Sequence, residues 1–158
     1  MHDHDKLVLQ RLGTGDANFL FELYSNTVVA EALGMTPFLS QESPIQFVER
    51  IIASCNCIFT IRLMRAPQII IGECALHDFD LQSGEIEIGG SLLPAYWGRG
   101  IMSSAFELLA SIAKRDFEAT TLIGRTNTSN ESAIKMAKKL GFEVHTVDGM
   151  DTIMRKSL

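Results

Sequence analysis

The sequence has few cysteines and no long apolar run. Its 158 residues include only three cysteines, and this odd number, with apolar neighbours, argues against a disulfide framework. The apolar runs are far shorter than the roughly 18 residues that a membrane span needs. Residues 1–5 are polar and lack the apolar centre of a signal peptide. We therefore expect a disordered tail at residues 1–5, a cytoplasmic protein and no membrane partner.

Positive charge is also scarce. The chain has 14 Lys and Arg residues against 19 Asp and Glu residues, a formal net charge of −5. Nucleic-acid binding requires basic side chains that neutralise phosphates, so a nucleic acid is not expected as a partner, whereas an amine or cationic substrate is compatible. Apolar residues make up 46% and charged residues 21%, as in an ordinary globular protein. The length predicts a single domain over residues 1–158.

Candidate metal ligands are sparse. Cys55 and Cys57 lack the second pair of ligands that structural zinc sites use. His77 and His145 are isolated in the sequence, and we interpret them as structural residues. No metal cofactor is expected.

Hydrophobic periodicity predicts alternating strands and helices. The predicted strands are Lys6–Leu12, Cys57–Arg65, Gln68–His77, Glu85–Leu93, Thr120–Thr126, Phe142–Val147 and Thr152–Arg155. The predicted helices are Ala17 to about Leu33, Pro44 to about Ile52, Ile101 to about Arg115 and Glu131–Leu140. Three consecutive strands with short turns predict an antiparallel meander, and Asp148-Gly149 predicts a final hairpin. The order β-α-α-β-β-β-α-β-α-β-β predicts an α/β fold with a mixed sheet.

The most informative stretch, residues 92–103, joins a predicted strand to a predicted helix. Its turn contains Gly98 and Gly100 and no carboxylate. A helix that begins here directs free backbone N–H groups and the positive end of its dipole into the turn, and glycine lets an anion approach the backbone. These features predict a phosphate site, to which Arg99 would add positive charge. An ordinary tight turn is the alternative, because two glycines before a helix are not a specific motif.

Three pieces of the chain resemble the GNAT superfamily of acyl-CoA-dependent N-acetyltransferases, most closely the Rim-type group that acetylates ribosomal-protein N-termini. Residues 71–73 with residues 85–89 are similar to the central hairpin of that family. Residues 93–100 are similar to its pyrophosphate loop, and Asn130 with residues 139–142 is similar to its late helix and Gly-Phe exit. The resemblance covers nearly the whole chain and implies a GNAT-like, mostly antiparallel central sheet flanked by helices.

The resemblance implies acetyl-CoA as the co-substrate. Its pyrophosphate is expected on the backbone amides of residues 98–102, and its pantetheine arm along the open edge of the strand over residues 88–93. Asn130 is expected to hydrogen-bond the arm. The expected cofactor-binding residues are Leu92, Leu93, Trp97, Gly98, Arg99, Gly100, Ile101, Met102 and Asn130.

The resemblance also implies direct acetyl transfer to a neutral amine, which needs a proton acceptor. We predict Glu87 as this base, with Glu85, two residues away on the same face, as the second choice. A solvated carboxylate without a catalytic role is the alternative for Glu87. Ser91 is predicted to lie near the thioester, with a packing role as its alternative. Ala137 stands where many members have a tyrosine general acid, so that acid is missing or comes from elsewhere.

The predicted function is transfer of an acetyl group from acetyl-CoA to a primary amine, either a protein N-terminus or a small-molecule amine. A catalytically inactive CoA-binding sensor or interaction domain of the same fold is the alternative, supported only by the missing tyrosine. The acceptor cannot be identified, because the predicted substrate-facing loops, residues 35–41 and 78–83, carry no recognisable pattern. The oligomeric state is equally open, and a homodimer is one option.

Overall fold

Apart from one helix that is divided in two, the predicted order of strands and helices is confirmed by the computed structural model, which describes residues 6–33 and 38–158. The predicted tail at residues 1–5 and residues 35–37 of one predicted substrate-facing loop lie outside the described residues. The elements are β1 (Leu7–Arg11), α1 (Ala17–Ser25), α2 (Thr27–Leu33), α3 (Pro44–Ser54), β2 (Cys55–Leu63), β3 (Ala66–Asp80), β4 (Glu85–Leu92), α4 (Ile101–Phe117), β5 (Thr121–Asn127), α5 (Glu131–Lys139), β6 (Glu143–Asp148) and β7 (Asp151–Ser157), with short 3-10 turns at Thr14–Asp16 and Pro94–Tyr96.

The single helix predicted over residues 17–33 is wrong, because Asn26 divides it into α1 and α2. The Asn26 backbone is extended, with φ −65° and ψ 122°. Its side-chain oxygen accepts hydrogen bonds from the N–H groups of Val28 and Val29, at 3.0 and 3.3 Å. An asparagine side chain can cap a new helix in this way in place of continuing the old one.

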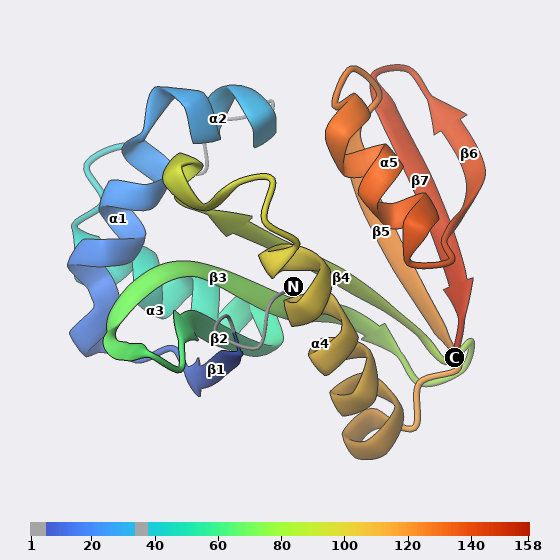
Figure 1. Cartoon of the computed structure of the whole chain (residues 1–158), viewed down its shortest axis with the longest axis horizontal. Coiled ribbons are helices and arrows are strands. Elements are labelled where there is room, and N and C mark those ends of the chain that lie inside the picture. The colour runs from blue at the N-terminus through green and yellow to red at the C-terminus, as the bar shows by residue number, and fades with distance from the viewer. Residues whose placement is uncertain (1–5, 34–37) are drawn as a thin grey trace.

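The strands form one seven-stranded sheet in the order β1-β2-β3-β4-β5-β7-β6 (Figure 1). Neighbouring strands are antiparallel except for β4 and β5, which run parallel. The predicted meander is therefore confirmed as β2-β3-β4, and the predicted hairpin as β6-β7. The turn between β6 and β7 contains Gly149, whose φ of +57° is the left-handed conformation that glycine favours.

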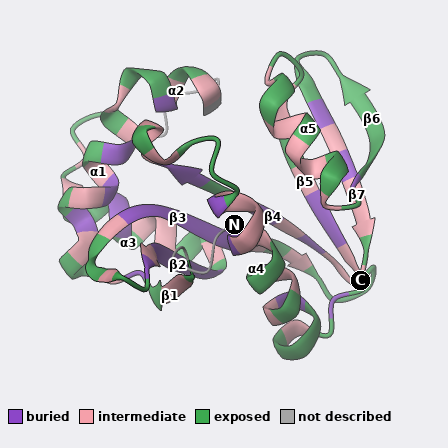
Figure 2. Ribbon diagram, viewed as in Figure 1, coloured by how far each residue is buried: buried purple, intermediate pink, exposed green. Residues whose placement is uncertain are grey.

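Helices cover both faces of this sheet. Ile58 and Ala75 pack with buried side chains of α1 and α3, and we call this side the α1 face. Their strand neighbours Phe59 and Leu76 belong to a second cluster with α4 and α5, and we call this side the α4 face. Figure 1 shows α4 and α5 on the same side of the sheet, and Figure 2 shows buried residues along β3 between the layers. None of the helices in the described residues is long and apolar enough to cross a membrane.

Candidate functional site

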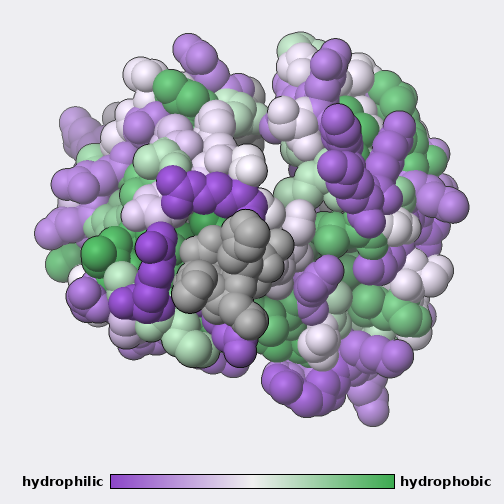
Figure 3. Space-filling view, viewed as in Figure 1, coloured by the Kyte–Doolittle hydropathy of each residue, from purple (hydrophilic) through white to green (hydrophobic). Residues whose placement is uncertain are grey.

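The sheet opens between its two parallel strands. β4 pairs with β5 only where residues 85–88 lie opposite residues 121–124. Beyond this point β4 continues to Leu92 and β5 continues to Asn127, each paired only with its other neighbour, β3 or β7. The two strands thus form a fork whose closed end lies at Ile88. The space-filling view shows the surface hollowed between the two halves of the molecule that this fork separates (Figure 3).

The glycine turn follows β4 and leads into α4. Gly98 and Gly100 have φ values of +74° and +75°, which disfavour a side chain. A Cβ atom at either residue would meet no atom of the described chain within 4 Å, so the space before α4 is open. The N-cap residue of α4, Gly100, has no side chain that could cap the helix, and the first N–H groups and positive dipole end of α4 therefore face this space. The turn has the geometry that a phosphate-sized anion requires.

Aromatic side chains hold the turn against β4. The Trp97 indole N–H donates to the Leu92 carbonyl oxygen at 3.0 Å. The Arg99 guanidinium lies 5.4 Å from the centre of the Tyr96 ring, and both Trp97 and Arg99 are exposed. Ile101 is buried, so only its backbone can face an anion in the turn.

The other predicted cofactor-binding residues differ in exposure. Leu92 is buried in the α4-face cluster, and Leu93 is half-buried against the α1-face cluster. Met102 is half-buried on α4, and its sulfur lies 3.1 Å from where a Cβ atom of Gly90 would be. A side chain at position 90 would therefore crowd α4 at the fork.

Asn130 lies on the other side of the fork, at the start of α5. Its Oδ1 accepts the Ala133 N–H at 3.2 Å, so this amide caps α5. Its Nδ2 lies 3.5 Å from the Ala32 carbonyl oxygen of α2, a long contact that links the two halves of the molecule. The expected bond from Asn130 to the pantetheine arm stays a prediction, and the amide oxygen would have to serve the cap as well.

Glu73 is a buried carboxylate that is not among the predicted site residues. It points to the α1 face, opposite Ser91 in the β3–β4 register, and is only 3% exposed. The Tyr24 hydroxyl of α1 donates to Glu73 Oε1 at 2.5 Å. Burial raises the pKa of Glu73 to about 7, although hydrogen bonds from Tyr24 and the Ser91 backbone lower it. The available sequence signal was a lone carboxylate in the apolar run over residues 69–76.

Ser91 belongs to the same buried group. Its side chain hydrogen-bonds to the Tyr24 hydroxyl, and Ser91 is 9% exposed. The predicted role of Ser91 beside a thioester stays a prediction, since its hydroxyl already has a partner in Tyr24.

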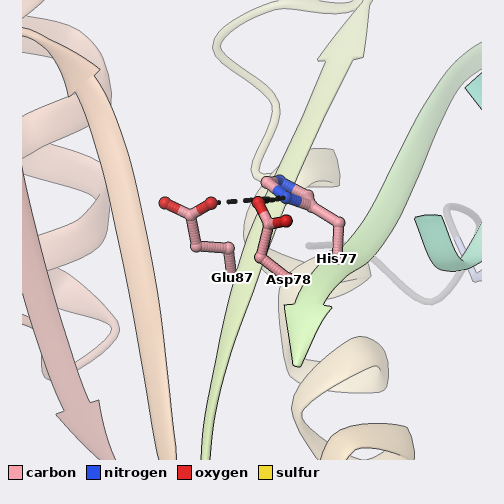
Figure 4. A group of neighbouring side chains, drawn as sticks. All are labelled: His77, Asp78 and Glu87. Atoms are coloured by element: carbon pink, nitrogen blue, oxygen red, sulfur yellow. Dashed lines mark hydrogen bonds and ion pairs between the residues drawn. The ribbon is translucent and has the colours of Figure 1, made fainter. Parts of the chain in front are cut away.

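His77, Asp78, Glu87 and Arg125 form a more open group at the closed end of the fork, which we call the His77 network. His77 Nδ1 lies 2.8 Å from Asp78 Oδ2 and 3.3 Å from Glu87 Oε2. Arg125 Nε of β5 donates to the other Glu87 oxygen at 3.1 Å. Figure 4 shows the His77 and Asp78 side chains from β3 converging with Glu87 from β4. The pKa of Asp78 is lowered mainly by its hydrogen bond with His77 and, to a smaller extent, by that with Glu87.

A bulge in β3 brings Asp78 to His77. Adjacent residues of a regular strand point to opposite faces. Asp78, however, has a left-handed φ of +52°, and the β3–β4 register shifts between His77 and Asp80. Such a bulge redirects a side chain, which explains how neighbouring residues meet here. The predicted strand Gln68–His77 is therefore too short, since β3 continues through the bulge to Asp80.

The donor atoms of His77, Asp78 and Glu87 lie within 4.8 Å of one another, the one such group of potential metal ligands in residues 6–33 and 38–158. They are already hydrogen-bonded together, and Arg125 sets a positive charge 3.1 Å from Glu87 Oε1. A metal ion would have to replace these bonds beside a like charge. These contacts are better suited to holding the His77 imidazole in one orientation than to binding a metal ion.

Two further predicted positions lie apart from the His77 network. Glu85 accepts a hydrogen bond from Arg155 Nη2 of β7 at 2.6 Å. It lies where β4 is paired with β5, away from the open part of the fork. Ala137 of α5 packs against the α4-face cluster. No proton donor therefore stands at this position, which many GNAT members fill with tyrosine.

Comparison with known proteins gives a consistent result. A family model described as an acetyltransferase (GNAT) domain matches residues 6–143. An uncharacterized N-acetyltransferase p20 from Bacillus licheniformis is 24% identical over 142 residues, which cover 88% of this chain and 80% of that protein.

Solved structures share the fold at low sequence identity. A spermidine N-acetyltransferase from Vibrio cholerae, in complex with CoA and spermine, superposes with a TM-score of 0.79 at 15% identity, covering 96% of this chain and 95% of that one. An aminoglycoside acetyltransferase, AAC(6')-Ib, in complex with coenzyme A, gives a TM-score of 0.79 at 17% identity, with the same coverage of both chains.

Proposed function

The chain belongs to the GNAT acetyltransferase domain family, and on this premise we propose that it acetylates a primary amine of a small polycationic molecule. Members of this family are acetyltransferases, and acetyl-CoA is the acetyl donor that agrees with the CoA complexes of the similar structures. The observation that carries the proposal is the fork between β4 and β5, which opens beside the glycine turn on one face and beside carboxylates on the other.

The donor side of the proposal rests on the glycine turn. The backbone N–H groups of residues 98–102 bind the pyrophosphate of acetyl-CoA, and Arg99 adds a mobile positive charge. The pantetheine arm follows the open edge of β4 into the fork, toward its closed end. The space that Gly98 and Gly100 leave empty supports this placement, because it gives an anion direct access to the first turn of α4.

The acceptor side rests on the acidic groups of the α1 face. Hydrogen bonding lowers the pKa of Asp78, whose side chain is 74% exposed and therefore offers a negative charge at the surface. Glu87 lies beside it, and proton transfer from the amine takes place at the His77 network, to which both carboxylates belong. A polycationic amine matches these charges and the net charge of −5. Two of the structurally similar proteins are named for spermidine and aminoglycoside acetylation, which supports the same class of acceptor.

An amine panel tests the proposed acceptor. Release of free CoA thiol from acetyl-CoA would be followed with spermine, kanamycin and a peptide with a free N-terminus. We expect kcat/KM for spermine or kanamycin to exceed that for the peptide at least tenfold. Faster turnover of the peptide would point to a protein N-terminus and the Rim-type relation, and no turnover of any amine would contradict the proposal.

A first prediction concerns the pyrophosphate site. Gly100→Asp should abolish acetyl-CoA binding, because its carboxylate would stand where the pyrophosphate binds and would repel it. Acetyl-CoA stabilises the folded state by mass action, so the wild-type melting temperature should rise with acetyl-CoA and that of Gly100→Asp should not. Gly149→Asp is the matched control, because Gly149 has φ +57° and equally open space but lies in the β6–β7 turn. An equal response of both variants would contradict the placement.

A further inference from the structure

A small space lies over Gly89, the first β4 residue beyond the closed end of the fork. Gly89 stands between Glu87 and Ser91 on the α1 face. A Cβ atom placed on Gly89 would meet one atom of the described chain within 4 Å, His77 Nε2 at 3.9 Å. The imidazole therefore presents its second nitrogen to this space while its first nitrogen is held by carboxylates.

The orientation of the imidazole is set by several groups. Nδ1 lies within hydrogen-bond distance of Asp78 at 2.8 Å and near Glu87 at 3.3 Å. A carboxylate at Nδ1 favours the tautomer that has its proton there, which leaves Nε2 free to accept a proton. The bulge at Asp78 fixes this arrangement, at the cost of a left-handed backbone, as occurs at functional sites.

We propose that His77 Nε2 is the atom that accepts the proton of the substrate ammonium, and that Asp78 and Glu87 position the imidazole. This inference rests on the proposed function, because the arm of acetyl-CoA must end beside Gly89. Glu87 itself is less suited to accept the proton, because Arg125 occupies one of its oxygens at 3.1 Å and His77 lies at the other. The glycine at position 89 leaves room for the amine between Nε2 and the thioester.

The proposed step moves two protons and replaces one C–S bond by one C–N bond. Neutral His77 takes one proton from R–NH3⁺ and becomes imidazolium. The amine nitrogen attacks the thioester carbonyl carbon, the C–N bond forms and the C–S bond breaks. The second nitrogen proton goes to the leaving thiolate, which yields the amide and CoA thiol and needs no tyrosine at position 137. His77 is partly exposed and returns its proton to water.

The titratable and charged groups around His77 come from four strands. Asp78 lies on its own strand β3, Glu87 on β4 and Arg125 on β5. Cys55 is its register partner on β2, and burial raises the pKa of the Cys55 thiol, which keeps that neighbour neutral near pH 7. The imidazole is thus surrounded by two carboxylates, one guanidinium and one neutral thiol.

The test uses His77→Gln in the full chain, with acetyl-CoA and whichever of spermine, kanamycin and the free peptide the wild type turns over fastest. Because positioned proton transfer contributes about 10²–10⁴-fold, kcat at pH 7 should fall about 100-fold. Acetyl-CoA affinity should change less than twofold. The loss should shrink as the pH approaches the pKa of the amine, about 10 for a lysine-like amine. Exogenous imidazole should restore activity to His77→Gly, in which the ring is deleted.

His145→Gln is the matched control, because His145 is exposed on β6, and its rate should equal that of the wild type. Wild-type-like rates for His77→Gln across the pH range would overturn the role of His77 and leave the proposed function intact. A loss that is equal at every pH and is not restored by imidazole would give His77 a structural role and would also overturn it. Failure of the wild type to acetylate all three amines would remove the proposed function as well.

Discussion

Glu73 and Glu87 point to the same face of two adjacent strands, yet their surroundings differ. Glu73 lies level with Ser91, and Glu87 lies four residues along β4, level with His77. Glu73 is 3% exposed and shares its group with the neutral side chains of Tyr24 and Ser91. The Glu87 side chain is 14% exposed and lies between Arg125 and His77.

This difference shows that burial alone does not make a carboxylate suitable for proton transfer with a substrate. Burial raises the pKa of Glu73 to about 7, which is a useful value for a general base. Tyr24 and α1 nevertheless cover this carboxylate, so an amine cannot reach it. The side chains of the His77 network are less buried, and His77 Nε2 faces open space over Gly89. Access and orientation distinguish the two groups.

The largest effect is expected for the pH dependence of stability at Glu73. Its pKa rises from 4.5 to about 7 in the folded state, so the folded protein binds this proton more tightly than the unfolded chain. This contribution to stability is complete below about pH 4.5 and is lost as the pH rises through 7, a change of about 3 kcal/mol. Glu73→Gln cannot ionise and should lack this loss.

Urea unfolding of both proteins between pH 4 and pH 8 measures the effect. The free energy of unfolding of the wild type, relative to that of Glu73→Gln, should decrease steadily over this range. Tyr24→Phe should extend the decrease to higher pH, because it removes a hydrogen bond that lowers the pKa of Glu73. Parallel curves for the wild type and Glu73→Gln would mean that Glu73 is ionised normally in the folded protein.

The sequence was sufficient to predict the fold and the turn that leads into α4. The alternation of strand residues predicted the meander, and Gly98 and Gly100 predicted an open turn before a helix, because local residue pattern determines both. The break at Asn26 was missed, since a side-chain cap within an otherwise helical pattern leaves the hydrophobic periodicity intact.

The His77 network could not be predicted in this way. The sequence places His77 ten residues from Glu87 and 48 residues from Arg125, and only the β3–β4–β5 pairing joins them. Asp78 reaches His77 through a bulge, and a bulge has no distinct signature among the polar residues at the end of a strand. Interpreting His77 as an isolated structural residue was therefore reasonable from sequence, although the structure places it beside two carboxylates.

A smaller effect is expected for Glu87→Gln, which keeps the shape of the side chain but removes its charge. Asp78 still holds the imidazole, so kcat should fall about tenfold, which corresponds to about 1.4 kcal/mol. Acetyl-CoA affinity should be unchanged. Glu85→Gln is the matched control, because Glu85 shares the face but pairs with Arg155 away from the fork. A loss of 100-fold or more, combined with a nearly normal His77→Gln, would return the role of base to Glu87.

The smallest effect is expected for Asp78→Asn. Asparagine tolerates the left-handed backbone of this position, so the bulge should persist and only the charge should be lost. The pKa of Asp78 is lowered in the folded state, so its carboxylate stabilises the protein above the unfolded pKa, and this contribution is lost as the pH falls through the folded pKa. Because the side chain is 74% exposed, solvent screening should limit the contribution to less than about 0.5 kcal/mol.

Three measurements together separate the charge of Asp78 from the strain of its backbone. The free energies of unfolding of Asp78→Asn and the wild type should differ slightly at pH 7 and converge at acid pH, and 1 M salt should reduce the difference. At pH 7, kcat should fall about threefold, because Glu87 alone then orients the imidazole. A large loss of stability that persists at acid pH would show that the Asp78 side chain holds the bulge itself, and the two roles would then be inseparable at this residue.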